Sequence, residues 1–286
     1  WRRRVGNIAA FARSAAAMDA SHFDTDPARR FGGIDRLYGE GAVARLGAAR
    51  VCVVGIGGVG SWAAEALARS GVGHLTLIDL DHVAESNINR QAHALETSLG
   101  QAKVLAMGER IRAINPRVSL RAVEEFVDAD NAATLLQGCD CVIDAIDNVR
   151  AKVAIVLACT AAHVPLIVAG GAGGKRDPRN VRVADLAHTY QDPLLAKVRK
   201  RLRTEHGFPR DTRRRFGIEA VYVEEPLRMP EALCDSAQGP QGLACAGYGS
   251  SMMVTAAVGL QLAARVLERL LADTVNAGTA GTAREA

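Results

Sequence analysis

Short apolar runs alternate with longer amphipathic segments from residue 50 onward. The runs rich in strand-forming residues are Val51–Val54, His74–Asp79, Val118–Val123, Cys141–Ala145 and Leu166–Ala169. Segments with helical periodicity lie between them, at Ser61–Ser70, Ala102–Ala113 and Ala151–Ala162. Because strands that alternate with helices form mainly parallel sheets covered on both faces, the pattern predicts an α/β fold with a doubly wound sheet.

The alternation divides the chain into regions. After Gly174 the sequence becomes polar and proline-punctuated, and periodic apolar sequence returns only over Ser251–Leu271. The expected regions are a disordered leader at 1–29, a core at 30–175, a second region at 176–250, a C-terminal helix at 251–272 as an appendage, and a disordered tail at 273–286.

The C-terminal apolar run is nearly long enough to cross a membrane. However, Gln261, Arg265, Glu268 and Arg269 give it a polar face. Charged side chains are costly in lipid, so we expect a packed or subunit-interface helix and not a membrane span.

The composition of the chain limits the possible fold, partners and cellular setting. With 286 residues and 49% hydrophobic content the chain can bury a sizeable core. The net charge of +4 is too small to indicate a nucleic-acid partner by itself. The six cysteines form no CxxC pair, which favours a reducing, cytoplasmic setting. The first 20 residues are rich in Arg and Ala but lack the apolar centre of a signal peptide, and Met18 is a candidate start.

A glycine-rich loop follows the first expected strand and opens a helix. Gly55, Gly57, Gly58 and Gly60 give a GxGxxG pattern in the context that phosphate-binding loops require. Asp79 ends the next strand about 20 residues later, where an acid accepts hydrogen bonds from ribose hydroxyls. A tight turn without a ligand is the alternative, but loop, strand and acid together favour a Rossmann-like nucleotide site.

The residues beyond Asp79 separate ATP from NAD. Asp81 is followed by Asn87, Arg90 and Gln91, then by Gly100-Gln101-Ala102-Lys103, and later by Asp144-Ala145-Ile146-Asp147-Asn148. This order resembles the ubiquitin-activating-enzyme superfamily, whose members adenylate carboxylates with ATP. The residues from 30 to 175 are then the ATP-binding adenylation core.

The resemblance assigns roles that fit the chemistry. Expulsion of pyrophosphate requires cations on the triphosphate, and Arg90 and Lys103 are the candidates. The resemblance also implies that Asn87 and Gln91 position phosphates, that Asp79 and Asp81 belong to the nucleotide site, and that Asp147 coordinates Mg²⁺, which binds few carboxylates beside phosphate oxygens. Taken singly, Arg90 and Lys103 could be surface charges and Asp147 a helix N-cap.

Arg36 extends this resemblance to a second subunit. Arg30-Phe31 and Arg36-Leu37-Tyr38-Gly39 precede the first strand, as an arginine-bearing segment does in the superfamily. There the arginine reaches the triphosphate of the neighbouring subunit, which implies a homodimer. An arginine on an amphipathic helix is the alternative.

The cysteines distinguish branches of the superfamily. Its thiamine and molybdopterin enzymes usually carry two CxxC pairs for zinc, which needs four ligands, and this chain has neither pair. Cys139 and Cys141 form a CxC in or near a strand, where alternation would place both on one face. We interpret them as core thiols.

Other motifs resemble the tRNA threonylcarbamoyladenosine dehydratases. They include Gly60-Ser61-Trp62, Gly170-Gly171-Ala172-Gly173-Gly174, Asp185-Leu186, Gln191-Asp192-Pro193-Leu194 and Cys245-Ala246-Gly247-Tyr248-Gly249. Such enzymes adenylate the threonyl carboxylate of a modified adenosine beside the anticodon and close a ring with net loss of water. This resemblance implies that residues 176–250 bind a tRNA substrate.

A basic segment over Lys197–Arg215 fits a tRNA partner. Its positively charged residues are Lys197, Arg199, Lys200, Arg201, Arg203, Arg210, Arg213, Arg214 and Arg215, against only Glu205 and Asp211. Concentrated positive charge in an otherwise slightly acidic chain is typical of phosphate-backbone binding. A solvated charged helix is the alternative.

Two rival functions share part of this pattern. An adenylyltransferase for a ubiquitin-like or sulfur-carrier protein would use the same nucleotide residues, and the missing zinc cysteines count against it. An NAD-dependent oxidoreductase or a non-catalytic nucleotide-sensing module would leave Lys103, Arg90 and Asp147 without a role. Cys234 and Cys245 lie where superfamily members hold reactive thiols, and a sulfur-handling protein is a candidate partner, but ring closure requires neither cysteine.

Overall fold

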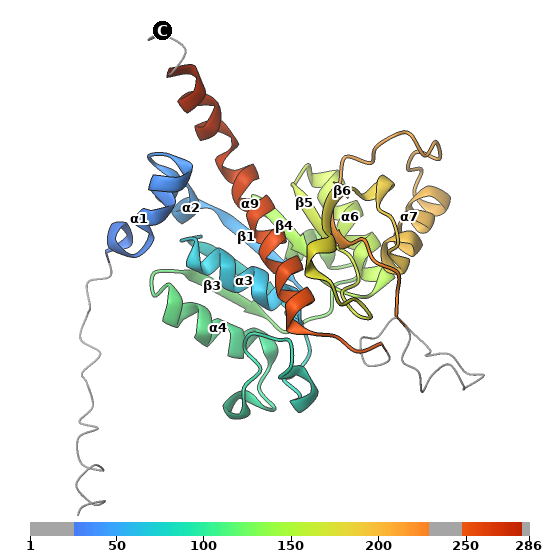
Figure 1. The fold of residues 1–286 in the computed structure, drawn as a ribbon, viewed down its shortest axis with the longest axis horizontal. Helices are drawn as coiled ribbons and strands as arrows, with labels where there is room; N and C mark the ends of the chain where they lie inside the picture. The colour runs from blue at the N-terminus through green and yellow to red at the C-terminus, as the bar shows by residue number, and fades with distance from the viewer. Residues whose placement is uncertain (1–25, 229–247, 282–286) are drawn as a thin grey trace, which may run out of the picture.

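A seven-stranded sheet forms the centre of the protein. The computed structural model describes residues 26–228 and 248–281, with side chains as far as residue 272. The strands follow the order β3-β2-β1-β4-β5-β7-β6 (Figure 1). Among the strands in the described residues, only β6 is antiparallel to its neighbour. In chain order, the strands are Arg50–Val54, His74–Ile78, Ser119–Val123, Cys141–Asp144, Leu166–Ala169, Val181–Asp185 and Glu219–Val223.

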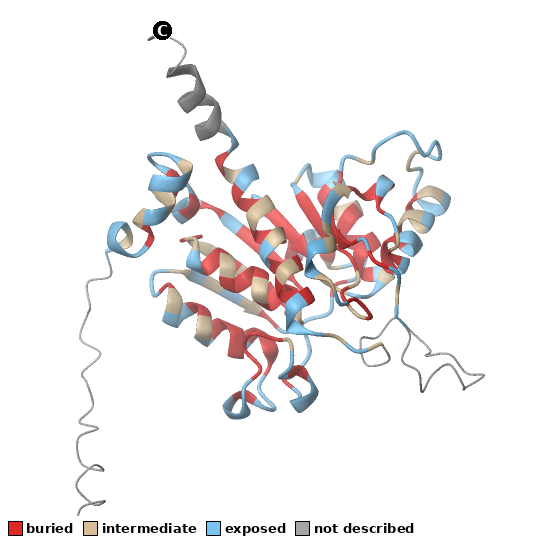
Figure 2. Ribbon diagram, viewed as in Figure 1, coloured by how far each residue is buried: buried red, intermediate tan, exposed pale blue. Residues whose placement is uncertain are grey.

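Helices cover both faces of this sheet. The first face packs against α3 (Gly60–Arg69), α4 (Lys103–Ile114) and α9 (Met252–Gly281), and the second against α5 (Ala132–Leu135), α6 (Val149–Ala162) and α7 (Pro193–Glu205). Two short helices, α1 (Pro27–Tyr38) and α2 (Ala42–Ala48), precede β1. Figure 2 shows the resulting layers, with buried residues concentrated in the strands and on the helix faces turned toward them. The expected doubly wound α/β fold is confirmed.

The site lies at the point of the sheet where the strand order reverses. β1 lies between β2 and β4, and all three strands run parallel. Chain connections from β1 therefore leave on one side of this point and those from β4 on the other. In open parallel sheets, ligands bind outside the carboxyl ends of strands at such a switch point.

Local signals explain several element boundaries. Gly71 follows the C-cap of α3 with φ of 84°, a backbone conformation that favours glycine. Asn148 caps α6 by accepting from the backbone N–H groups of Arg150 and Ala151. The alternative interpretation of Asp147 as that N-cap is therefore wrong. Asp192 caps α7, and Pro193 takes its first position.

The region after Gly174 holds more regular structure than its polar sequence indicates. β7 pairs with β5, and β6 pairs with β7, so the central sheet continues into this region. Most of Lys197–Arg215 lies on α7 and in the following loop. The charged residues of α7 lie on its solvent side. Its other side is apolar and buried, and consists of Leu194, Leu195, Val198 and Leu202.

The structured part of the chain begins earlier and ends later than the sequence predicts. Asp26 accepts from Ala28 N–H and α1 starts at Pro27, so a leader ending at residue 29 is wrong at its last residues; residues 1–25 lie outside the described part. α9 continues past the expected end at 272 as far as Gly281, because no proline interrupts its backbone hydrogen bonding. Only 282–286 of the expected tail at 273–286 lie outside the described residues. Among the helices described, none has the length and apolarity to cross a membrane.

The cysteine doublet is arranged differently from the expectation. β4 starts at Cys141, whose side chain packs in the cluster on the α3 face. Cys139 precedes the strand and packs against the cluster on the opposite face. Strand alternation therefore does not apply to it, and the prediction of one shared face is wrong. Cys234 and Cys245 lie outside the described residues.

Candidate functional site

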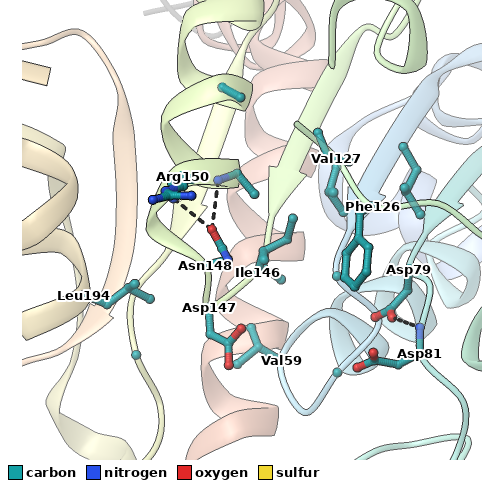
Figure 3. A pocket seen from close by; sticks show the side chains of 18 of the residues that line it. Val59, Asp79, Asp81, Phe126, Val127, Ile146, Asp147, Asn148, Arg150 and Leu194 are labelled. Atoms are coloured by element: carbon teal, nitrogen blue, oxygen red, sulfur yellow. Dashed lines mark hydrogen bonds between the residues drawn. The ribbon is translucent and has the colours of Figure 1, made fainter. Parts of the chain in front are cut away.

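A cavity of about 1030 Å³ lies at the carboxyl ends of β1 and β4. It is lined by nearly all of the nucleotide-site residues expected from the sequence, namely Gly55, Gly57, Gly58, Asp79, Asp81, Asn87, Arg90, Gln91, Lys103 and Asp147. Figure 3 shows Asp79 and Asp81 on one side of this cavity and Asp147 and Arg150 on the other. Gly60 and Arg36 do not line it.

The glycine loop is shaped by close backbone contacts. Gly55 has φ of 87°, and a Cβ there would lie 2.9 Å from the carbonyl carbon of Ala145. A Cβ on Gly60 would lie 1.8 Å from the carbonyl oxygen of Gly55. Gly60 therefore lets the loop close on itself, although it does not face the cavity. Gly57 has open space at its Cβ position and faces the cavity directly.

Asp79 joins the end of β2 to the glycine loop. Its carboxylate accepts from the backbone N–H of Ile56 at 2.6 Å and from that of Asp81 at 2.9 Å. Burial raises the pKa of Asp79, while the charge of Lys103 and these two hydrogen bonds act in the opposite direction. The carboxylate is thus fixed at the cavity wall, in the position expected for a ribose-binding acid.

Two cations reach the cavity from the segment after β2. Lys103, at the start of α4, is buried and forms an ion pair with Asp81 at 2.7 Å. Arg90 donates to the Ser86 carbonyl oxygen at 2.7 Å and to Asn89 Oδ1 at 2.9 Å. A Cβ on Gly58 would lie 3.2 Å from Arg90 Cγ, so the arginine stem crosses directly over the loop.

Trp62 fixes the backbone of the Arg90 segment. Its Nε1 donates to the Arg90 carbonyl oxygen at 2.8 Å. Ser61, the preceding residue, accepts from the Ala92 N–H at 3.2 Å. The Gly-Ser-Trp motif therefore holds the arginine-bearing segment against the glycine loop, a role that its sequence alone does not reveal.

Asn87 and Gln91 have different local surroundings. Asn87 Oδ1 accepts from the Ala84 N–H at 3.1 Å and caps the short 3₁₀ helix η2 (Glu85–Asn87). Gln91 is buried, and its Oε1 has no hydrogen-bond partner among the described residues. Buried polar atoms are normally paired, so the Gln91 amide is a candidate ligand contact.

Asp147 is the one expected metal ligand. It is exposed and faces the cavity just before the cap of α6 (Figure 3). No cluster of three or more potential protein ligands occurs in residues 26–228 and 248–281. Mg²⁺ commonly takes only one or two carboxylates and fills its shell with phosphate oxygens and water. A single carboxylate beside a phosphate-binding loop therefore fits Mg²⁺ held together with a nucleotide.

The rest of the cavity is lined by residues that follow β5 and by α7. Asp192 Oδ2 accepts from the Gly171 N–H at 2.8 Å, and a Cβ on Gly170 would lie 2.2 Å from this oxygen. Burial raises the pKa of Asp192. Arg201 and His206 line the same cavity, so α7 connects the nucleotide residues with the basic segment.

The basic segment contains two kinds of cation. Arg201 pairs with Glu205 at 2.9 Å, Arg213 pairs with Asp211 at 3.1 Å, and Arg215 lies 3.6 Å from Asp185. Arg203 stacks over Phe216 at 5.1 Å, and Arg199 donates to the Thr189 hydroxyl. The remaining members, Lys197, Lys200, Arg210 and Arg214, are exposed and form no ion pair within the described part of the chain.

Arg36 lies outside the cavity of its own chain. It is exposed in the last turn of α1. The structure therefore does not bring Arg36 together with the other expected nucleotide residues.

Several cavity residues were not assigned to the site from the sequence. Phe126 is 70% exposed, although it is a large apolar side chain, and it lines the cavity near Asp79 (Figure 3). Thr255 enters from α9, and Asp192 from the start of α7. Only Asp192 had a local signal, because Asp-Pro is typical of a helix start.

Comparisons with known proteins agree with this geometry. A tRNA threonylcarbamoyladenosine dehydratase of Escherichia coli is 46% identical over 258 residues, which cover 87% of this chain and 96% of that protein. A tRNA threonylcarbamoyladenosine dehydratase of Bacillus subtilis is 38% identical, over 78% of this chain and 87% of that protein. The crystal structure of the E. coli enzyme in complex with ATP matches with a TM-score of 0.79 and 44% identity, over 87% of this chain and 96% of that one.

A family model places these similarities in a wider group. It is the model of the ThiF family, and it matches residues 33–283. The matched range includes the glycine loop, the Arg90 segment, α7 and all of α9. The chain therefore belongs to the ThiF family, as a relative of the tRNA threonylcarbamoyladenosine dehydratases.

Proposed function

We propose that this protein is an ATP-dependent, tRNA-modifying dehydratase. It would adenylate the threonyl carboxylate of threonylcarbamoyladenosine next to the anticodon, after which the carbamoyl group displaces AMP and closes a ring. One observation carries the proposal: all the expected nucleotide residues except Gly60 and Arg36 line a single cavity together with Arg201 of the basic helix α7. ATP and an RNA substrate could thus meet in one cavity.

The nucleoside of ATP would bind at the β2 side of the cavity. The Asp79 carboxylate would accept hydrogen bonds from ribose hydroxyls. Phe126 and Val127 offer apolar surface for the adenine beside it (Figure 3), and an exposed aromatic ring suits stacking on a base. The phosphates would then extend over the glycine loop toward Arg90 and Lys103.

Adenylation requires charge stabilisation more than covalent catalysis. The substrate carboxylate attacks the α-phosphorus, and pyrophosphate leaves with the electron pair of the broken bond. Arg90 and Lys103 would stabilise charge on the phosphates during this step. Asp147 would hold Mg²⁺, which supplies further neutralisation of the triphosphate when bound. Asp81 would keep the Lys103 ammonium oriented through its 2.7 Å ion pair.

The tRNA would approach over α7. Lys197, Lys200 and Arg214 are exposed and free of ion pairs with described residues, so they can exchange solvent contacts for phosphate contacts. Backbone contacts of this kind position a nucleic acid without reading its sequence. The modified base would reach the cavity past Arg201 and the glycine-rich turn at Gly171.

The assembly would be a homodimer in the cytoplasm. The position of Arg36 outside its own cavity supports a role at the triphosphate of a neighbouring subunit, as the superfamily resemblance implies. A sulfur-handling partner would act through Cys234 or Cys245, and the dehydration chemistry does not depend on it.

AMP release distinguishes this function from activation of a carrier protein. The protein would be incubated with ATP and Mg²⁺, together with threonylcarbamoylated tRNA, the same tRNA without the modification, or a peptide ending in Gly-Gly. We expect AMP and pyrophosphate to form with the modified tRNA alone, and Asp79→Ala to weaken ATP binding by about 1.5–3 kcal/mol. Turnover with the peptide alone would reject the proposal.

A further inference from the structure

The first turn of α9 carries a buried hydroxyl without a partner. Thr255 is 3% exposed, and its Oγ1 makes no hydrogen bond within the described residues. Threonine hydroxyls inside helices usually bond to the carbonyl four residues earlier. Here the Ser251 carbonyl accepts from the Thr255 N–H at 3.1 Å, as in any helix, and the Thr255 hydroxyl does not share this acceptor. An unpaired buried hydroxyl is costly, which indicates a partner that arrives with a ligand.

Thr255 lies against the phosphate-binding loop. It lines the nucleotide cavity, and a Cβ on Gly58 would lie 3.3 Å both from Thr255 Cγ2 and from Arg90 Cδ. The loop before α9 is attached to the same place, because Asn89 Nδ2 donates to the Ser250 carbonyl at 2.8 Å. Thr255, Gly58 and Arg90 therefore meet at one point of the cavity wall.

Close helix packing fixes this arrangement. A Cβ on Gly259 would lie 2.5 Å from the Val59 carbonyl oxygen, so α9 approaches the glycine loop at backbone distance. The N-terminus of a long helix carries a partial positive charge and attracts anions. α9 has 30 residues, and its first turn adjoins the loop and the Arg90 guanidinium stem. The buried Gln91 Oε1, also without a partner among described residues, belongs to the same cavity.

We propose that Thr255 and the N-terminus of α9 form a subsite for the β- and γ-phosphates of ATP and for the pyrophosphate that leaves. The inference rests on the proposed function, because it takes the cavity to be an ATP site. During adenylation a carboxylate oxygen bonds to the α-phosphorus, and the bond from this phosphorus to the bridging oxygen breaks. The bridging oxygen keeps the electron pair. The hydroxyl of Thr255 would donate to the departing pyrophosphate.

The subsite predicts a selective effect on phosphate-chain length. Thr255→Val keeps the shape of the side chain and removes the hydroxyl, whereas Thr255→Ser keeps the hydroxyl. Thr76→Val, in β2 and outside the cavity, is the matched control. Calorimetric titrations of the full-length protein with ATP, pyrophosphate and AMP would measure the affinities.

We expect Thr255→Val to weaken ATP and pyrophosphate binding at least about tenfold, the effect of one hydrogen bond to a charged group. AMP affinity should not change, and Thr255→Ser should bind all three ligands like the wild type. Ligand-free Thr255→Val should also be no less thermostable than the wild type, because the lost hydroxyl had no partner.

Three results would overturn the subsite. They are an unchanged ratio of ATP to AMP affinity in Thr255→Val, loss of affinity for pyrophosphate in Thr255→Ser as well, and an equal effect of Thr76→Val. Wild-type protein that binds neither ATP nor AMP would instead reject the proposed function itself, and the subsite with it. Normal wild-type binding with an unaffected Thr255→Val variant would reject the subsite alone.

Discussion

The nucleotide end of the cavity and the basic segment are built in different ways. At the nucleotide end, Asp79 and Lys103 are each held by short hydrogen bonds to neighbouring residues, and glycines allow backbone contacts that no side chain would permit. In the basic segment, Arg213 is largely exposed, although it pairs with Asp211. Lys197 and Lys200 project into solvent.

This difference shows what residue spacing and charge counting can each reveal. A preorganised site constrains residue identity at fixed positions, so its motif identifies individual side chains. A charged surface tolerates exchange between neighbouring positions, and counting its charges includes cations that are already paired. We therefore expect single substitutions to have large effects at the nucleotide end and graded effects in the basic segment.

The largest expected effect is the loss of Lys103. Lys103→Ala removes a buried cation from the proposed site of pyrophosphate departure, and we expect turnover to fall by about 10²–10³. Steady-state AMP formation at saturating ATP would measure this loss. Arg112→Ala, which removes an exposed cation from the same helix, should have little effect. Similar rates for the two variants would contradict the distinction between the preorganised nucleotide end and an ordinary charged surface.

The dependence of protein stability on pH tests whether the surroundings of the nucleotide end are buried. His93 lies near Lys103, and burial lowers its pKa to about 4. The unfolded chain therefore binds a proton on His93 more readily, and the free energy of unfolding should decrease as pH falls from about 6.5 to about 4. The total decrease in the free energy of unfolding from His93 is on the order of 3 kcal/mol.

Chemical denaturation across this pH range would measure the loss. His93→Leu should flatten the dependence relative to the wild type, whereas His82→Ala, at an exposed position, should leave it unchanged. Parallel curves for wild type and His93→Leu would contradict the assignment.

Two glycines of one loop provide a matched stability test. Gly60→Ala would place a methyl group 1.8 Å from the Gly55 carbonyl oxygen, and we expect a loss of unfolding free energy of about 1–3 kcal/mol. Gly57→Ala meets no atom within 4 Å and should change stability by less than about 0.5 kcal/mol. Thermal denaturation of both variants would decide, and equal losses would mean that the loop is not closed in this way.

The smallest and most graded effect is expected in the basic segment. Replacing Lys197, Lys200 and Arg214 by Ala should flatten the dependence of log tRNA affinity on log salt by about 0.7–0.9 per lost phosphate contact. Replacing Arg213, Arg214 and Arg215 changes the net charge equally but removes two arginines that already face an acid. This second triple variant should flatten the slope less.

Binding titrations at several salt concentrations would compare the two sets, with ATP affinity as the control because Arg213–Arg215 do not line the nucleotide cavity. Identical slopes would show that charge alone governs binding. Unaltered slopes in both variants would remove the support that the segment gives to a tRNA substrate.

The sequence predicted the parallel core well because its signals are local. The strand at Leu166–Ala169 was predicted at its observed bounds, since a continuous apolar run indicates a strand buried on both faces. The glycine loop and Asp79 follow from fixed spacing along one βαβ unit. β7 was missed because Glu219–Val223 is a short run in a region dominated by charge.

Contacts between distant segments could not be predicted in the same way. Thr255 meets Gly58 across almost 200 residues, and nothing near Thr255 in the sequence indicates this approach. Phe126 resembles any surface aromatic residue until the cavity beside Asp79 is known. The paired state of Arg201 and Arg213 also depends on rotamers and loop geometry, which charge spacing does not specify.

The hydrogen bond from Trp62 to the Arg90 carbonyl also has a spectroscopic consequence. The chain contains two tryptophans, and the other, Trp1, lies outside the described residues. The emission of an indole depends on its hydrogen bonding and on the polarity around it. Because the Trp62 N–H is bonded directly to the backbone of Arg90, a shift of that backbone segment on nucleotide binding would alter the emission. The protein thus carries an intrinsic fluorophore attached to the proposed leaving-group site.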